Sequence, residues 1–176
     1  MGKATELLSE EHKYILKVID SMIKECSLVK SGKSIDKTFF LNAIDFIRNF
    51  ADKFHHAKEE DILFVELCSD ELNLHCNPIE QMLYEHGLGR NFVKGLEQAI
   101  NSNDAKKVVE NALGYSQLLQ EHIWKEDNIL YPMADQALPE KTQKSIFERF
   151  KKVESEKFAK NSIKNYWDFA EECKRR

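Results

Sequence analysis

Two stretches of the sequence share one pattern and decide the fold. They are His55–Val65 (HHAKEEDILFV) and His122–Pro132 (HIWKEDNILYP). The stretches align without a gap, so that histidine matches histidine, Lys-Glu matches Lys-Glu and Ile-Leu matches Ile-Leu. Each contains His-x-x-x-Glu, and residues four apart lie one turn apart on the same face of an α-helix. The sequence therefore predicts two helices that each present a histidine and a glutamate on one side.

A shorter repeat lies upstream of each stretch. Glu11-His12 precedes the first stretch, and Glu85-His86 precedes the second. The chain is therefore predicted to consist of two related helical hairpins. Each hairpin has one histidine on its first helix and His-x-x-x-Glu on its second.

Apolar residues recur at steps of three and four along four segments, which is the spacing of one face of a helix. The segments cover about 4–29, 34–67, 77–101 and 104–137. The second is expected to begin at Ser34 or Asp36, and Pro132 is expected to kink or interrupt the fourth. The residues expected to face the core are Leu8, His12, Ile15, Ile19, Met22 and Cys26; Leu41, Ile44, Ala51, His55, Glu59 and Ile62; Ile79, Met82, Leu83, His86, Val93, Leu96 and Ile100; and Val108, Ala112, Tyr115, Leu119, His122, Glu126, Ile129 and Met133.

Four such helices with short connections predict an all-α fold, an up-down-up-down four-helix bundle over residues 1–138. Residues 139–176 again have helical spacing with many charges, and we expect them to form one or two helices packed on the bundle as a C-terminal extension. The chain has only 6 Gly and 3 Pro, which argues against the many tight turns of an all-β fold.

Composition excludes several classes of protein. The 176 residues are 42% hydrophobic and carry a net charge of −4, which suits a folded chain with a real core. No apolar run is long enough to span a membrane, and no apolar stretch near the N-terminus indicates a secretory signal. A pI near 5.9 does not favour binding to nucleic acid.

The four cysteines give little information. Cys26, Cys68, Cys76 and Cys173 lack Cys-x-x-Cys spacing, so free thiols in a cytoplasmic protein are expected. Cys68, His75 and Cys76 would be a poor zinc site, because they offer only three loosely spaced ligands. We expect His75 to lie on the surface.

The placement of histidine and glutamate predicts a site for two metal ions. A buried, ionised carboxylate costs several kcal/mol unless it is paired or bound to a metal. No matching buried Lys or Arg lies on these stripes, and a pair of divalent or trivalent cations resolves the problem. Nitrogen and oxygen ligands without thiolates suit non-haem iron or manganese better than structural zinc. The predicted metal ligands are His12, His55, Glu59, His86, His122 and Glu126.

Two alternatives compete with this interpretation. A single core histidine is often only hydrogen-bonded, and a single His-x-x-x-Glu is often a solvated helix pair. His56 and Glu60 also have the same spacing as His55 and Glu59. The repeat favours His55 and Glu59, because His56 matches Ile123.

The pattern resembles the hemerythrin-like (HHE cation-binding) family over about residues 5 to 135. The matching segments are Glu11-His12, 55–60, 82–90 and 121–127. The resemblance implies a four-helix bundle around an oxo- or hydroxo-bridged centre of two iron ions, with manganese or zinc as substitutes. Glu11 and Glu85 each precede a predicted ligand and are candidates to hydrogen-bond the rings of neighbouring ligands, with solvent-facing charges as the alternative.

One departure from the family matters. Oxygen-carrying hemerythrins have His-x-x-x-His on the third helix, and here Met82 takes the first position, four residues before His86. Thioether sulfur is a poor ligand for ferric iron. The sequence therefore offers four histidines and two glutamates, or a further ligand from elsewhere. The candidates for that ligand are Tyr14, Tyr84, Tyr115, Glu154 and Glu156.

A sparser ligand set leaves coordination positions open, which favours redox turnover over simple oxygen carriage. The leading hypothesis is a cytoplasmic protein that binds or reduces O₂, peroxide or NO, with activity as a peroxide or NO reductase left open. The alternatives are an O₂, iron or redox sensor without turnover, and an iron-centre repair or delivery protein. The expected partners are a small ligand and an electron donor, with a monomer or homodimer, no nucleic acid and no membrane. Trp124, Leu119, Ile62 and Phe50 are candidates for a dry wall around the ligand.

Overall fold

The computed structural model describes residues 2–68, 78–157 and 160–176, and all its regular elements are helical, which confirms the all-α prediction. Three of these elements, labelled η, have the wider turns of a π-helix. The elements are α1 (Lys3–Lys30), α2 (Lys37–Phe46), η1 (Ile47–His56), η2 (Glu59–Leu63), α3 (Phe64–Leu67), α4 (Pro78–Asn101), α5 (Ala105–Lys125), η3 (Glu126–Leu130), α6 (Tyr131–Ala137), α7 (Glu140–Lys157) and α8 (Lys160–Lys174).

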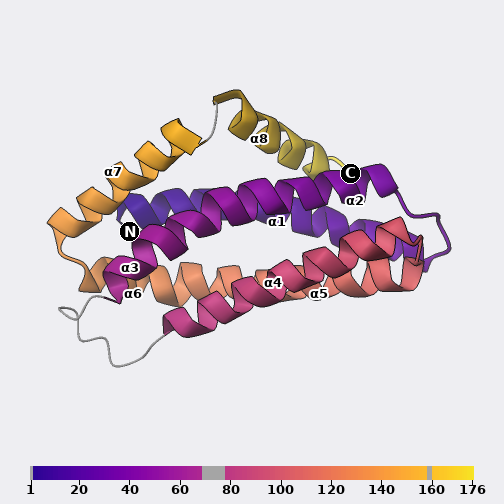
Figure 1. Ribbon diagram of the computed structural model, residues 1–176, viewed down its shortest axis with the longest axis horizontal. Helices are drawn as coiled ribbons and strands as arrows, with labels where there is room; N and C mark the ends of the chain where they lie inside the picture. The colour runs from indigo at the N-terminus through magenta and orange to yellow at the C-terminus, as the bar shows by residue number, and fades with distance from the viewer. Residues whose placement is uncertain (1, 69–77, 158–159) are drawn as a thin grey trace.

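Four long arms run in alternating directions and form a bundle (Figure 1). The arms are α1, then α2 through α3, then α4, then α5 through α6. α1 contacts α5, α5 contacts α4, α4 contacts α2, and α2 contacts α1, so the four arms form a closed ring. The C-terminal helices α7 and α8 both pack on α1, and α7 also reaches η2. The bundle thus has the predicted up-down-up-down order.

The tight turns of the bundle follow from short polar residues. α1 ends where Gly32 adopts a φ of +96°, and the amides of Gly32 and Lys33 bond back to the last turn. Asn103 takes the same role after α4, with a φ of +56°. The next residue, Asp104, then caps α5 by accepting a hydrogen bond from the Lys107 amide at 3.0 Å. α2 begins in the same way, at Asp36, one of the two predicted start points.

The apolar core is divided into two clusters by a polar layer. Each arm passes from one cluster to the other: α1 from Leu8 to Ile15, and α4 from Met82 to Val93. The residue between them on α1 is His12, and on α4 it is His86. The predicted ligand positions therefore lie where the two clusters meet.

The prediction of burial is wrong for three residues expected in the core and for one expected in the wall around the ligand. Leu41, Leu83, Ile129 and Trp124 are between 43% and 59% exposed. Ile129 lies in the π-turn η3, where a wider turn rotates the side chains away from the stripe that a regular α-helix would give. The fourth arm therefore departs from α-helical geometry at Glu126, before the predicted interruption at Pro132. Pro132 stands within the first turn of α6, where its missing N–H costs little.

The remaining sequence predictions have mixed outcomes. Cys26, Cys68 and Cys173 are free thiols, as expected. His75 and Cys76 lie outside the described residues. Among the described helices, none is both long enough and apolar enough to cross a membrane.

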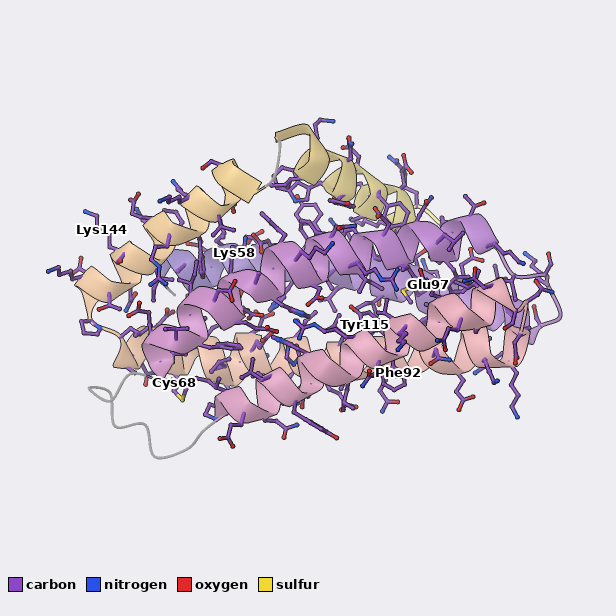
Figure 2. All side chains as sticks on the ribbon, in the orientation of Figure 1. Lys58, Cys68, Phe92, Glu97, Tyr115 and Lys144 are labelled. Carbon is purple, nitrogen blue, oxygen red and sulfur yellow. The ribbon has the colours of Figure 1, made fainter. Side chains whose placement is uncertain are left out.

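The packing of α7 on the bundle gives a stability test. Phe150 of α7 is fully buried in the apolar cluster that holds Leu8. Phe150→Ala is expected to lower the free energy of unfolding by about 3–5 kcal/mol, measured by urea denaturation, because it leaves a cavity. Lys144→Ala is the control, since Lys144 is exposed on the same helix (Figure 2).

The same experiment tests the division of the chain into residues 1–138 and 139–176, which stays a prediction. If Phe150→Ala unfolded in two steps, with the main transition unchanged, the extension would be an appendage that contributes nothing to the bundle. A single transition at lower urea concentration would show that extension and bundle unfold together.

Candidate metal centre

All six predicted ligands lie in the polar layer between the two apolar clusters. Their exposed fractions are 2% or less. The six come from all four arms: His12 (α1), His55 (η1), Glu59 (η2), His86 (α4), His122 (α5) and Glu126 (η3). The π-type turns η1, η2 and η3 each hold one of them, and such turns occur often at functional sites.

The four imidazoles form two pairs. His86 and His122 place their Nε2 atoms 3.0 Å apart, with ring centroids at 4.7 Å and planes inclined by 65°. His12 and His55 have centroids 4.6 Å apart and planes inclined by 55°. Two nitrogens bound about 2.1 Å from one metal at right angles would lie about 3 Å apart. The His86–His122 pair therefore has the spacing of two imidazoles on one ion, and His12 and His55 offer donor atoms that lie within 4.8 Å of each other.

The two glutamates connect these pairs. Glu126 places Oε1 3.1 Å from Nε2 of His122, and places Oε2 3.2 Å from Nε2 of His12. Glu59 Oε2 lies 3.7 Å from Nε2 of His55 and also 3.7 Å from Nε2 of His86. Each carboxylate thus faces one imidazole of either pair, which is the position of a bridging ligand.

Several of these atoms lack hydrogen-bond partners. Within the described part of the chain, Glu59 Oε2, His55 Nε2 and both carboxylate oxygens of Glu126 make no hydrogen bond of good geometry. A buried polar atom without a partner costs about 1–3 kcal/mol. Several such atoms that converge on one place favour a bound cation, and the donor set therefore fits a metal.

Nδ1, the ring nitrogen that faces away from the site, has a carboxylate partner in each of the four imidazoles. Nδ1 of His55 lies 2.9 Å from Glu11, and Nδ1 of His122 lies 2.8 Å from Glu85, as predicted for both glutamates. The other two rings follow the same rule, with His12 bound to Asp127 and His86 bound to Glu60, at 3.0 and 2.7 Å. A carboxylate on Nδ1 holds the proton there, which leaves the lone pair of Nε2 directed at the site.

A lysine donates to each of the two glutamates, Glu11 and Glu85, that bind Nδ1 of a predicted ligand. Lys125 donates to Glu85, and Lys58 donates to Glu11. Lys58 is fully buried, because it lies 3.7 Å above the Phe54 ring and is covered by α7, where Glu154 accepts from it at 3.4 Å. These lysines partner the supporting acids and leave Glu59 and Glu126 to the imidazoles.

The candidates for an additional ligand stay predictions, and the structure shows where most of them lie. Glu154 binds Lys58, Tyr84 is 61% exposed, and the Tyr14 ring stacks on Trp167. Met82 lies in an apolar cluster. Tyr115 is buried, and its hydroxyl has no hydrogen-bond partner among the described residues. The side chain of Glu156 lies outside the described residues.

His56 is closer to the site than the sequence indicated. Its donor atoms lie within 4.8 Å of those of His86 and His122, and it is 7% exposed. Successive side chains diverge less in the π-type turn η1 than in an α-helix, so adjacent histidines both point inward. The His56 ring stacks on His86 at 3.8 Å with planes only 11° apart. A metal lies in the plane of each imidazole that binds it, so these parallel rings do not share one ion.

Tyr131 is the second residue that sequence reasoning missed. Its hydroxyl donates to Glu59 Oε1 at 2.6 Å, and its ring stacks parallel to His12. The repeat contained a signal for it, because Tyr131 matches Phe64, which stacks on His86. The two aromatic rings thus cover equivalent histidines, and only one of them carries a hydroxyl.

Burial and mutual repulsion separate the pKa values of the two glutamates. Burial, together with the charge of Glu126, raises the pKa of Glu59 well above its ordinary value. Burial acts in the same direction on Glu126, but His122 and His12 outweigh it and hold its pKa well below the usual range. Burial likewise opposes the charge of His122, yet Glu126 and Glu85 raise the pKa of His122 to about 9. Without metal, the layer therefore holds protons that bound cations would displace.

The raised pKa of His122 predicts how the metal-free protein depends on pH. Because the folded pKa is about 9 and the ordinary value is 6.5, this contribution to stability is complete below pH 6.5 and is lost as the pH rises to 9. The melting temperature of the metal-free protein should fall over this range. Glu126→Gln should flatten the fall, because it removes the strongest attraction for the imidazolium. The exposed neighbour Glu121→Gln is the control, and an equal slope in all three proteins would contradict the assignment.

A comparison with protein families shows the family of this chain. The family model described as the hemerythrin HHE cation binding domain matches residues 3–134, a range that includes all six predicted ligands. No curated protein and no solved structure matches the chain. The match covers most of the sequence and confirms the resemblance drawn from the repeated His and Glu motifs. The chain belongs to the hemerythrin HHE cation-binding family.

Proposed function

We propose that the protein binds two iron ions in the polar layer and that this non-haem centre binds or reduces O₂, peroxide or NO. The observation that carries the proposal is the position of Glu126, whose two oxygens face imidazoles of different pairs at 3.1 and 3.2 Å. A carboxylate placed in this way suits a bridge between two cations. In this proposal His12 and His55 hold one ion, His86 and His122 hold the other, and Glu59 and Glu126 bridge them.

The donor set supports iron over the alternatives. Each position is offered two imidazoles and carboxylate oxygen, the combination found with open coordination positions in non-haem iron oxygenases. No cysteine belongs to the groups of inward-facing donors in the described residues, so the soft ligands that favour copper(I) are missing there. Manganese or zinc would bind similar donors, and metal analysis distinguishes the three.

The residues around the site prepare it for small ligands. Bound iron would supply the exchange of one electron per ion with such a ligand. The carboxylates on Nδ1 fix each imidazole, and the two apolar clusters keep bulk water away from the layer. Tyr131 holds a proton at its hydroxyl oxygen against Glu59, because burial, together with the charges of Glu126 and Glu59, raises the pKa of the phenol well above its ordinary value.

A second candidate function, a redox or oxygen sensor, is favoured by the contact between site and extension. Glu154 of α7 binds Lys58, Lys58 binds Glu11, and Glu11 binds His55. A change at the metal would thus reach the C-terminal extension through three polar contacts. If limited proteolysis cut α7 at the same rate in the oxidised and reduced proteins, this candidate would be rejected.

Metal analysis of the isolated protein tests the leading proposal. We expect two irons per chain, and a visible spectrum of the oxidised protein that changes when peroxide or NO is added. His55→Ala and His122→Ala should each lose at least one iron, because each removes one imidazole from one position. Glu121→Gln, beside His122 but exposed, should retain both irons. Full iron content in both histidine variants, or a protein isolated without iron that fails to take it up, would overturn the proposal.

A further inference from the structure

Four aromatic side chains form a continuous line from the surface of α8 to the metal site. From the outside inward they are Trp167 of α8, Tyr14 of α1, and Phe50 and Phe54 of η1. Trp167 stacks on Tyr14, with ring centroids 5.8 Å apart and planes inclined by only 24°. The Tyr14 ring meets Phe50 edge-on at 6.4 Å, and Phe50 lies 5.4 Å from Phe54. We call these four residues the aromatic line.

The inner part of the aromatic line is joined to one of the two imidazole pairs. Phe54 directly precedes His55 in the sequence, and Tyr14 follows His12 by two residues on α1. Residues two apart in an α-helix have Cα atoms about 5.4 Å apart, so Tyr14 is close to His12 through the backbone alone. The aromatic line therefore reaches the His12–His55 end of the polar layer by two short connections.

The outer end of the aromatic line is open to solvent. Phe50 and Phe54 are buried, Tyr14 is partly buried, and Trp167 is 41% exposed. Tyr14 and Trp167 also line a surface groove whose sides are α7 and α8, and α8 packs along α1 (Figure 1). Small molecules in solution can therefore reach the outermost ring, whereas the inner rings are covered.

The members of the aromatic line differ in how easily they are oxidised. Tyrosine and tryptophan lose one electron far more readily than phenylalanine or the backbone, so Tyr14 and Trp167 are the oxidisable members. Lys17, which Glu171 binds at 2.5 Å, places its ammonium 4.6 Å from the centre of the Tyr14 ring. A cation over the ring disfavours a positive charge on it. Water around the exposed Trp167 stabilises such a charge and accepts a proton, so an electron vacancy is held longer on Trp167 than on Tyr14.

We propose that the aromatic line carries oxidising equivalents from the metal site to Trp167, where a thiol in solution removes them. The inference rests on the proposed function, because it adds oxidation of thiols to the reduction of peroxide at the same centre. An oxidant left in the buried layer would attack the imidazoles and the phenol of Tyr131 around it. The aromatic line conducts that oxidant to the surface, which makes Tyr14 and Trp167 redox-active residues.

The electrons and protons of this reaction balance. Hydrogen peroxide that meets the fully oxidised site takes two electrons and two protons and becomes two water molecules, which leaves the site two electrons short. The aromatic line returns these electrons one at a time, and each time Trp167 loses one electron and its indole proton passes to water. Each oxidised indole then takes a hydrogen atom from a thiol, and two sulfur radicals combine to one disulfide. The sum is one peroxide and two thiols converted to two waters and one disulfide.

Oxidation of the two tryptophans of the chain tests this transfer. Trp124 is the internal control, because it also follows a predicted ligand, His122, by two residues and is more exposed than Trp167, at 59%. Iron-loaded protein is treated with hydrogen peroxide without thiol, and oxidised tryptophan is measured by mass spectrometry of peptides. We expect several-fold more oxidation at Trp167. Oxidant that acts from solution would mark the more exposed Trp124 at least as strongly, and this result in a protein with two irons would overturn the inference.

Tyr14→Phe tests the connection within the aromatic line, with the exposed Tyr84→Phe as its matched control. Phenylalanine keeps the ring contacts but is hard to oxidise, so oxidation of Trp167 should fall several-fold while the iron content stays that of the parent. Samples frozen shortly after addition of peroxide should show a tryptophan radical by electron paramagnetic resonance in the parent and in Tyr84→Phe, and a weaker one in Tyr14→Phe. Equal oxidation of Trp167 in all three proteins would overturn the aromatic line as the route.

Trp167→Phe and Trp124→Phe test the thiol reaction, with reduced glutathione and hydrogen peroxide as the probes. Disulfide formation above the rate of the metal-free protein should slow several-fold in Trp167→Phe and stay at the parent rate in Trp124→Phe. A protein that takes up no iron would refute the proposed function and this inference with it. A protein with two irons that reduces peroxide, but forms disulfide equally fast in both variants, would refute the inference alone.

Discussion

Two fully buried carboxylates at the centre of a helical bundle constrain the rest of this molecule. Glu59 and Glu126 face imidazoles, one phenol and each other. An unpaired charge in such a place is expensive, so every neighbouring polar group is arranged around it. The imidazoles turn Nε2 inward because carboxylates hold their Nδ1 protons, and the two lysines hold carboxylates of that outer layer in turn. These polar contacts extend from the two glutamates through the imidazoles and the carboxylates on Nδ1 to the two lysines.

The two halves of the chain build this order twice. Glu11 and Lys58 support His55 in the first half, as Glu85 and Lys125 support His122 in the second. The same correspondence relates Glu60 to Asp127, each of which binds the histidine of the other half. Each histidine from the first helix of a hairpin is thus oriented by an acid from the opposite hairpin. The halves depend on each other, and neither hairpin can assemble its part of the site alone.

Much of this arrangement could be predicted from spacing, because an α-helix repeats with a fixed period. The four arms, the position of His12 and His86 on their stripes, and the choice of His55 by its match to His122 all follow from that period. The π-type turns do not, since they depend on tertiary packing. They turn His56 inward and Ile129 outward, against the expected stripes. The burial of Lys58 under α7 was equally hidden, because it needs a contact between residues far apart in sequence.

The departures from the repeat make the two halves of the centre unequal. Tyr131 brings a hydroxyl to Glu59 on the side of His12, where the equivalent Phe64 offers His86 only a ring. His56 stacks on His86, whereas its counterpart Ile123 is aliphatic. Cations placed at the two ends therefore meet different fields and different proton donors. In the proposed centre of two ions, loading would then be stepwise, with one end filling at lower metal concentration, and the duplicated scaffold would make two neighbouring ions chemically distinct.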